Sequence, residues 1–280
     1  MINTSTDLYC ILGNPVAHSK SPLLHNTGFE IHGVNAAYLA FEPRDIGQAA
    51  AAIRALGIKG ASVTIPFKVF VMEHLDWIDE KALAIGAVNT IVNEDGRLLG
   101  YNTDYKAAVD PLKPFGLEGK KVLILGAGGA AKAVAFGVWE KGARVVVANR
   151  TEDRGRRLAD RYKGGFVSPE DMARLDVDIV INTTSLGMAP RIDARAFPEH
   201  LIRPEMVVMD VVYTPLDTRL ISQARKKGCA TIDGLSMFLA QAAAQFSLWT
   251  GISLDTDLVR RTIYDNINEP NEQPKGDKTK

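Results

Sequence analysis

Several polar residues before position 105 have side chains that could carry out acid–base chemistry on a small molecule. Lys68 follows an apolar run at 60–65, and Asp104 follows a pair of apolar runs that ends near Tyr101. A carboxylate can orient a lysine ammonium, and the ammonium can protonate an oxygen that is gaining electron density. Neutral hydrogen-bonding residues lie at similar positions, beside or after neighbouring runs: Ser19, Ser21, Thr64, Asn89, Asn102 and Thr103.

Taken singly, these residues also have purely structural explanations. Ser21 could cap a helix, Lys68 could be a solvated helix residue, and Asp104 could cap a helix that starts at Tyr105. Taken together at the carboxyl ends of strands, one cation, one anion and several neutral donors would face one site. This set suits a polyhydroxylated carboxylate, because hydroxyls and amides can bind its oxygens without a buried counter-charge. If a hydride reaches a carbonyl there, Lys68 is the best donor of the accompanying proton.

The segments that carry these residues alternate between strand-like and helical patterns. The expected strands are 9–13, 35–41, 60–65, 88–92 and 97–101. The expected helices are one that starts at Pro22 with Ser21 as its N-cap, 45–56, one that starts at Pro66, and 80–85. Asp95-Gly96 between two apolar runs predicts a hairpin. Residues 1–104 are therefore expected to form an α/β domain with a mixed sheet.

A second unit centres on the glycines that follow the apolar run 122–125. Strand, tight turn and helix are predicted in that order, with a further strand at 145–148. Gly126 permits the turn, Gly128 lets backbone N–H groups approach a pyrophosphate, and Ala131 is small enough for close packing. The phosphates would lie at the positive end of the helix that begins near Gly129. The candidate contacts are Gly126, Ala127, Gly128, Gly129 and Ala130.

The end of the second strand of this unit distinguishes NADP from NAD. Enzymes that use NAD usually have Asp or Glu there, whereas this chain has Asn149, Arg150 and Thr151. A guanidinium can bind a 2′-phosphate through two charge-assisted hydrogen bonds, so NADP is the predicted cofactor. Arg154, one helical turn on, could add a second positive charge. The alternative is a solvated helix face, which we favour for Arg156 and Arg157.

The remaining pattern predicts a Rossmann-like doubly wound sheet followed by two helices. Further strands are expected at 178–181, 206–209 and 230–232, with helices at 153–162 and 218–227. Amphipathic helices follow at 237–249 and 257–267, and we expect them to return to the first domain. The predicted domains are thus 1–104 plus 235–268, for substrate, and 105–234, for NADP. The polar segment 269–280 is predicted to be a disordered tail.

Bulk composition excludes several classes of function. The 280 residues hold 33 Lys and Arg against 33 Asp and Glu, so no charge excess favours nucleic acid or an anionic membrane. No apolar stretch reaches membrane-spanning length and no leader pattern is present, so a cytoplasmic enzyme is expected. Cys10 and Cys229 form no disulfide framework. The histidines show no close metal-ligand spacing and are interpreted as surface or supporting groups: His18, His25, His32, His74 and His200.

At these same residues the sequence resembles the shikimate/quinate dehydrogenase family, over nearly all of 8–268. The resemblance rests on several motifs in a fixed order. They are His18-Ser19-Lys20-Ser21-Pro22, Val63-Thr64-Ile65-Pro66-Phe67-Lys68, Gly86-Ala87-Val88-Asn89-Thr90, Asn102-Thr103-Asp104, Gly126-Ala127-Gly128-Gly129-Ala130, Asn149-Arg150-Thr151, Asn182-Thr183-Thr184-Ser185, and Asp233-Gly234-Leu235-Ser236-Met237 with Gln241.

The resemblance implies an NADPH-linked, reversible reduction of 3-dehydroshikimate to shikimate in the pathway to chorismate and the aromatic amino acids. It implies that Lys68 and Asp104 form the catalytic pair. The implied substrate contacts, besides that pair, are Ser19, Ser21, Thr64, Asn89, Tyr213 and Gln241. Gly234 and Met237 are implied to lie near the nicotinamide.

Two residues depart from the common family pattern, and two alternatives to the proposed activity stay open. Ser62 stands where many members have Asn, and Tyr105 where many bacterial members have Gly, so Tyr105 bears on substrate preference. One alternative is a quinate-active dehydrogenase with broader substrate or cofactor use. Another is a non-catalytic NADPH-binding sensor, against which the retention of Lys68 and Asp104 argues. The expected assembly is a monomer or a homodimer.

Overall fold

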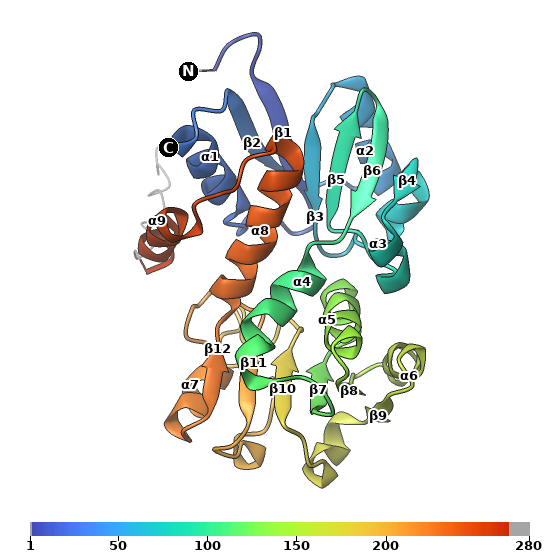
Figure 1. The fold of residues 1–280 in the computed structure, drawn as a ribbon, viewed down its shortest axis with the longest axis vertical. Helices are drawn as coiled ribbons and strands as arrows, with labels where there is room; N and C mark the ends of the chain where they lie inside the picture. Colours follow the sequence, from blue (N-terminus) through green and yellow to red (C-terminus); the bar gives the residue numbers. More distant parts are fainter. Residues whose placement is uncertain (1, 269–280) are drawn as a thin grey trace, which may run out of the picture.

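The computed structural model describes residues 2–268. They form two α/β units, each built on a six-stranded sheet (Figure 1). The predicted tail, 269–280, lies outside the described residues. The α/β class with two sheets is confirmed. No helix within the described range is long and apolar enough to cross a membrane.

The first sheet is mixed and has the strand order β2-β1-β3-β5-β6-β4. Its strands are β1 (Asp7–Leu12), β2 (Ala36–Phe41), β3 (Gly60–Val63), β4 (Trp77–Ile78), β5 (Thr90–Glu94) and β6 (Arg97–Tyr101). β1 lies parallel to β2 and β3, whereas β5 is antiparallel to β3 and β6. Asp95 (φ 50°) and Gly96 (φ 90°) are both left-handed between β5 and β6. This confirms the predicted Asp-Gly hairpin, whose turn requires that conformation at both positions.

Helices from both ends of the chain cover this sheet. They are α1 (Ser21–Ile31), α2 (Ile46–Ala55), α3 (Glu80–Ile85), α8 (Gly234–Thr250) and α9 (Thr256–Asn268). Figure 1 shows α8 and α9, drawn in orange and red, beside the blue α1. Phe238 and Phe246 of α8 and Val259 of α9 share one buried cluster with Tyr9 and Phe29. After completing the second sheet, the chain therefore returns to pack against the first.

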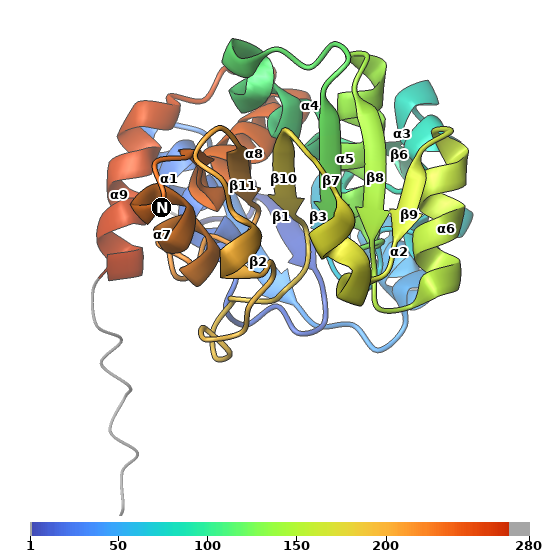
Figure 2. The same cartoon turned by 90° about the horizontal axis from the view of Figure 1, so that it is seen from below.

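The second sheet is wholly parallel, with the order β12-β11-β10-β7-β8-β9. Its strands are β7 (Lys121–Leu125), β8 (Arg144–Ala148), β9 (Gly165–Val167), β10 (Ile179–Asn182), β11 (Val207–Asp210) and β12 (Ala230–Ile232). Its helices are α5 (Gly129–Glu140), α6 (Glu152–Arg161) and α7 (Arg219–Lys226). The order reverses between β7 and β10, as seen along the sheet in Figure 2. Ligands of doubly wound sheets bind at the carboxyl ends of strands beside such a reversal.

Two segments connect the sheets. α4 (Asp104–Val109) and the 3₁₀ helix η2 (Asp110–Phe115) lead from β6 to β7. α8 starts at the edge of the second sheet, where Met237 joins the core of that sheet, and it ends in the core of the first. Lys132 of α5 also donates to the carbonyl oxygen of Gly86 at 3.1 Å, and Arg161 to that of Ile85 at 3.3 Å.

The structure corrects two local predictions and adds two short strands. The helix predicted at Pro66 is instead a turn over 65–69, followed by the 3₁₀ helix η1 (Phe70–His74). α1 begins at Ser21 with Lys20 as N-cap, so the Ser21 hydroxyl is not the cap. Short strands β4 and β9 were not predicted, because two or three residues carry too little periodicity to identify a strand.

His25 contradicts the interpretation of the histidines as surface or supporting groups. Its side chain is fully buried in the first domain, with its ring stacked 4.5 Å from that of Tyr38. Burial lowers the pKa of His25 to about 3, so it is a neutral core residue. A lone histidine in a helical pattern gives no sequence signal that separates this environment from an exposed one.

Asp210, at the carboxyl end of β11, is hydrogen-bonded to the carboxyl end of β10 in the second sheet. Its carboxylate accepts hydrogen bonds from Asn182 Nδ2 (2.9 Å), the Val212 backbone N–H (3.0 Å) and Thr218 Oγ1 (2.7 Å). The residue is fully buried. Burial raises the pKa of Asp210 to about 6, and the three donors only partly oppose that effect.

The raised pKa of Asp210 predicts a pH-dependent contribution to stability. A folded-state pKa of about 6 against an ordinary value of 3.8 means that folding favours the protonated form. We therefore expect this carboxyl to stabilise the fold most below about pH 4, and that contribution, about 3 kcal/mol, to be lost as the pH rises through 6. Urea unfolding of wild type and Asp210→Asn at acid and neutral pH measures the difference.

The matched control is Asp178→Asn. The Lys121 backbone N–H lowers the pKa of Asp178, so this variant should change the pH dependence in the opposite direction. An identical pH dependence of the free energy of unfolding in wild type and Asp210→Asn would contradict the prediction.

Candidate active site

Lys68 and Asp104 lie together in the structure. Lys68 is in the turn after β3 and Asp104 is the first residue of α4, and Lys68 Nζ lies 2.6 Å from Asp104 Oδ2. The side chains are 14% and 5% exposed. Such a shielded ammonium–carboxylate contact has one well-defined geometry, unlike an ion pair between mobile surface groups.

Asn89 holds the other oxygen of the Asp104 carboxylate. Its amide Nδ2 donates to Asp104 Oδ1 at 2.8 Å and to Thr103 Oγ1 at 2.9 Å. Its Oδ1 accepts from the Thr103 backbone N–H at 2.8 Å. A backbone N–H can only donate, so the amide oxygen must face the Thr103 N–H. Turning the amide around would break this hydrogen bond and the one to Asp104.

The Lys68–Asp104 pair lies against the start of the glycine-turn helix. A Cβ placed on Gly129, the first residue of α5, would be 3.0 Å from both Cβ and Cδ of Lys68. Any larger residue at 129 would press on the lysine stem. The Lys68–Asp104 pair of the first domain is thus adjacent to the glycine turn of the second.

The other predicted substrate contacts come from several separate segments of the chain. Ser19 Oγ donates to Ser21 Oγ at 3.2 Å, at the start of α1. The ring of Tyr213 stacks 4.4 Å from that of Phe238, and burial raises the pKa of Tyr213. Gln241 donates through Nε2 to the Phe238 carbonyl oxygen, one turn back on α8. Among the described residues, neither these side chains nor that of Thr64 hydrogen-bonds to Lys68 or Asp104.

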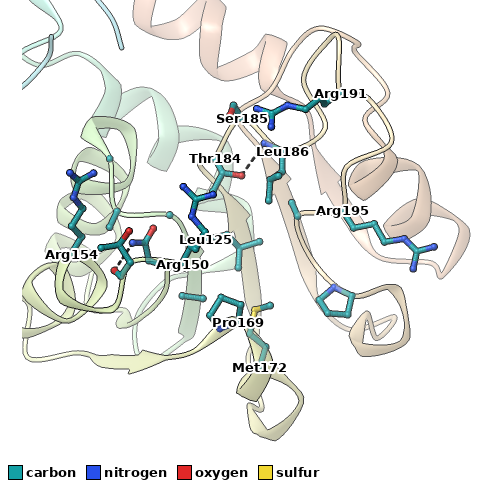
Figure 3. Close-up of a pocket in the computed structure, with 18 of the residues that line it drawn as sticks. Leu125, Arg150, Arg154, Pro169, Met172, Thr184, Ser185, Leu186, Arg191 and Arg195 are labelled. Carbon is teal, nitrogen blue, oxygen red and sulfur yellow. Dashed lines mark hydrogen bonds between the residues drawn. The ribbon is translucent and has the colours of Figure 1, made fainter. Parts of the chain in front are cut away.

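A large groove opens at the carboxyl ends of the second sheet, with a volume of about 1130 Å³ (Figure 3). Seven of the predicted cofactor contacts line it: Gly126, Ala127, Gly128, Asn149, Arg150, Thr151 and Arg154. Gly126 has a φ of +112°, and a Cβ there would lie 2.8 Å from Thr183 Oγ1, so only glycine fits. Gly128 faces open space, which leaves its backbone accessible to a ligand.

Four predicted cofactor residues lie outside the groove lining. Gly129 and Ala130 form the first turn of α5, directly after the groove. A Cβ at Gly234 would overlap the Val212 carbonyl oxygen, so this glycine permits close packing of the strand end against α8. Met237 is buried in the core of the second sheet.

The electrostatics of the groove favour a polyanion. Its lining contains Arg150, Arg154, Arg191, Arg195 and Lys227, and one carboxylate, Glu199, within the described part of the chain. Figure 3 shows Arg150 and Arg191 on opposite walls. The first two cations were predicted and the others were not. The segment that carries Arg191 and Arg195 has no repeating pattern, so its sequence gives no signal of where it folds.

The residues present fit a phosphorylated dinucleotide. The glycine turn leaves backbone accessible at the N-terminus of α5, as a pyrophosphate requires. At the end of β8, Asn149 Nδ2 donates to the Thr151 carbonyl oxygen, and neither residue carries the negative charge that would repel a 2′-phosphate.

Family models cover most of the chain in three consecutive segments. The "Shikimate dehydrogenase substrate binding domain" matches residues 11–91, "Shikimate / quinate 5-dehydrogenase" matches 110–236, and "Shikimate 5'-dehydrogenase C-terminal domain" matches 234–264. A relative from Moorella thermoacetica named "Shikimate dehydrogenase (NADP(+))" is 44% identical, over 94% of each chain. The chain belongs to the shikimate dehydrogenase family.

Solved structures of shikimate and quinate dehydrogenases share the fold throughout. Shikimate 5-dehydrogenase from Thermus thermophilus, in complex with NADP(H) and shikimate, is 35% identical with a TM-score of 0.85, covering 93% of this chain and 99% of that one. Quinate dehydrogenase from Corynebacterium glutamicum, in complex with NAD, is 30% identical with the same TM-score and coverage.

The two residues that depart from the family pattern have different structural roles. The ring of Tyr105 packs edge-on against Phe136 of α5 at 5.5 Å, and Lys81 Nζ lies 5.1 Å above it. Its bulk therefore fills the contact between α4 and α5. Ser62 is buried and accepts a hydrogen bond from the Tyr38 hydroxyl at 2.6 Å.

Proposed function

We propose that this protein catalyses the NADPH-dependent, reversible reduction of 3-dehydroshikimate to shikimate. The observation that carries the proposal is the 2.6 Å contact between Lys68 and Asp104, shielded from solvent and lying against the start of the glycine-turn helix. A ketone reductase needs a proton donor beside the point where hydride arrives, and this pair provides one.

In this proposal Lys68 is the general acid and Asp104 holds it in place. NADPH supplies the hydride when bound. The Lys68 ammonium donates a proton to the carbonyl oxygen as negative charge develops there, and in the reverse direction the neutral amine removes the hydroxyl proton. The Asp104 carboxylate orients the ammonium, and Asn89 keeps that carboxylate from rotating.

The other predicted contacts, all from the first domain except Tyr213, would bind the substrate. Ser19 and Ser21 offer hydroxyls for its carboxylate, and the other proposed contacts are Thr64, Asn89, Tyr213 and Gln241. The cofactor would lie in the groove, with its 2′-phosphate on Arg150 and Arg154. We propose Gly234 and Met237 as neighbours of the nicotinamide, from the family resemblance.

The division into domains follows from the same assignment. We propose 1–104 plus 235–268 as the substrate-binding unit and 105–234 as the NADP-binding unit. The shared cluster of Tyr9, Phe246 and Val259 supports the discontinuous first unit. A cytoplasmic setting fits the two buried free thiols, Cys10 and Cys229. We propose a monomer or a homodimer as the working assembly.

A quinate-active enzyme is the second candidate, because the structural similarity extends to a quinate dehydrogenase. Initial rates with shikimate and with quinate, each with NADP and with NAD, separate the candidates. We expect shikimate with NADP to be turned over fastest. Faster turnover of quinate, or with NAD, would favour the quinate enzyme, and no turnover of either acid would favour a non-catalytic NADPH sensor.

A further inference from the structure

A row of buried polar side chains runs through the first domain and ends at the Asp104 carboxylate. Tyr38 donates to Ser62 at 2.6 Å, and Ser62 Oγ donates to Gln245 Oε1 at 2.8 Å. Gln245 Nε2 donates to Thr90 Oγ1 at 3.0 Å, and Thr90 Oγ1 donates to Asn89 Oδ1 at 2.7 Å. Asn89 then donates to Asp104 at 2.8 Å.

The direction of every donor in this row is fixed by backbone groups. Gln245 Nε2 also donates to the Asn89 carbonyl oxygen at 3.2 Å, and a carbonyl oxygen can only accept. The Gln245 amide oxygen must therefore face Ser62. The Thr103 backbone N–H fixes the Asn89 amide in the same way. Because Gln245 donates to the Thr90 oxygen, the Thr90 hydroxyl hydrogen is left to donate to Asn89.

All the donors therefore point toward the carboxylate, in an interior that excludes water. Tyr38 and Thr90 are fully buried, and Gln245 is 2% exposed. Hydrogen bonds aligned head to tail in a low-dielectric environment strengthen one another. The last bond of the row occupies Asp104 Oδ1 and leaves Oδ2 to Lys68.

We propose that Gln245 is a positioning residue for the acid–base pair. From α8 it fixes Asn89 at two points, the carbonyl oxygen directly and the side chain through Thr90. Asn89 in turn sets the orientation of Asp104 and so of Lys68. This inference rests on the roles proposed for Lys68 and Asp104. It assigns to α8 a function in catalysis that depends on an amide with no contact to the reacting groups.

Two pairs of substitutions test the proposal in the full-length enzyme. Thr90→Val removes the hydroxyl link at nearly constant volume, and Thr90→Ser keeps it. Gln245→Leu removes the amide, and Phe246→Leu, at the next residue of α8, alters an equally buried side chain that belongs to no polar row. Steady-state kinetics with shikimate and NADP, and Tm, are measured for each.

We expect kcat to fall about tenfold in Gln245→Leu and Thr90→Val, with KM for NADP unchanged. Thr90→Ser should retain most of the wild-type kcat, and Phe246→Leu should lower Tm and leave kcat within about twofold. Lys68→Ala distinguishes a failure of the positioning role of Gln245 from a failure of the roles proposed for Lys68 and Asp104. If it is impaired while Gln245→Leu and Thr90→Val retain wild-type kcat, the positioning role is overturned and the roles of the pair stand. If Lys68→Ala retains wild-type kcat, the proposed roles themselves fail.

Discussion

Replacing Lys68 by alanine is expected to lower kcat at least ~100-fold while the protein stays folded. Removing a general acid typically costs 10²–10⁴-fold in rate, because water must then protonate the developing alkoxide. The Lys68 ammonium is the cation that contacts the shielded Asp104 carboxylate, at 2.6 Å. Steady-state rates with shikimate and NADP give kcat, and circular dichroism reports whether the fold is retained.

Lys81→Ala is the matched control for this experiment. Lys81 also forms an ion pair, with Glu140 of the second domain at 2.9 Å, but its side chain is 47% exposed. Exposed pairs contribute little to stability, so we expect wild-type kcat within about twofold. Wild-type turnover in Lys68→Ala would refute the general-acid role. An equal loss in both variants would mean that the loss of a lysine ion pair in general, rather than the loss of a proton donor, lowers the rate.

Replacing Arg150 by aspartate is expected to shift preference from NADP toward NAD by on the order of 100-fold in the ratio of kcat/KM values. The variant loses a charge-assisted contact to the 2′-phosphate, worth about 1.5–3 kcal/mol, and adds a repulsive charge. An aspartate at this strand end can also accept hydrogen bonds from the ribose hydroxyls of NAD. Rates with both cofactors at saturating shikimate provide the ratio.

Arg156→Asp is the control, because it makes the same charge change on the same segment. Arg156 pairs with Glu152 at 2.7 Å, stacks over Phe166 and does not line the groove. Its cofactor ratio should stay close to that of wild type. An unchanged ratio in Arg150→Asp would place the 2′-phosphate on other cations of the groove, with Arg191 on the opposite wall as the first to test.

Tertiary structure accounts for the predictions that were wrong and for the residues that were missed. His25 lies in the core because α1 packs its inner face on Tyr38 of β2, a contact that no local pattern specifies. Pro66 can begin a helix, but the chain instead turns here and brings Lys68 back toward Asp104. Arg191 and Arg195 come from an irregular segment, whose sequence has no periodic pattern from which its position could be predicted.

The sequence by itself determined the features whose causes are local. These are the Asp-Gly hairpin, the strand–glycine–helix unit, and an arginine in place of a carboxylate after β8, since each follows from the backbone or charge of a few consecutive residues. Only the tertiary structure decided which polar groups meet. Gln245 contacts Asn89, which is 156 residues away in the sequence, and Lys68 contacts Asp104, which is 36 residues away. These contacts are buried because helices from both ends of the sequence pack against the first sheet.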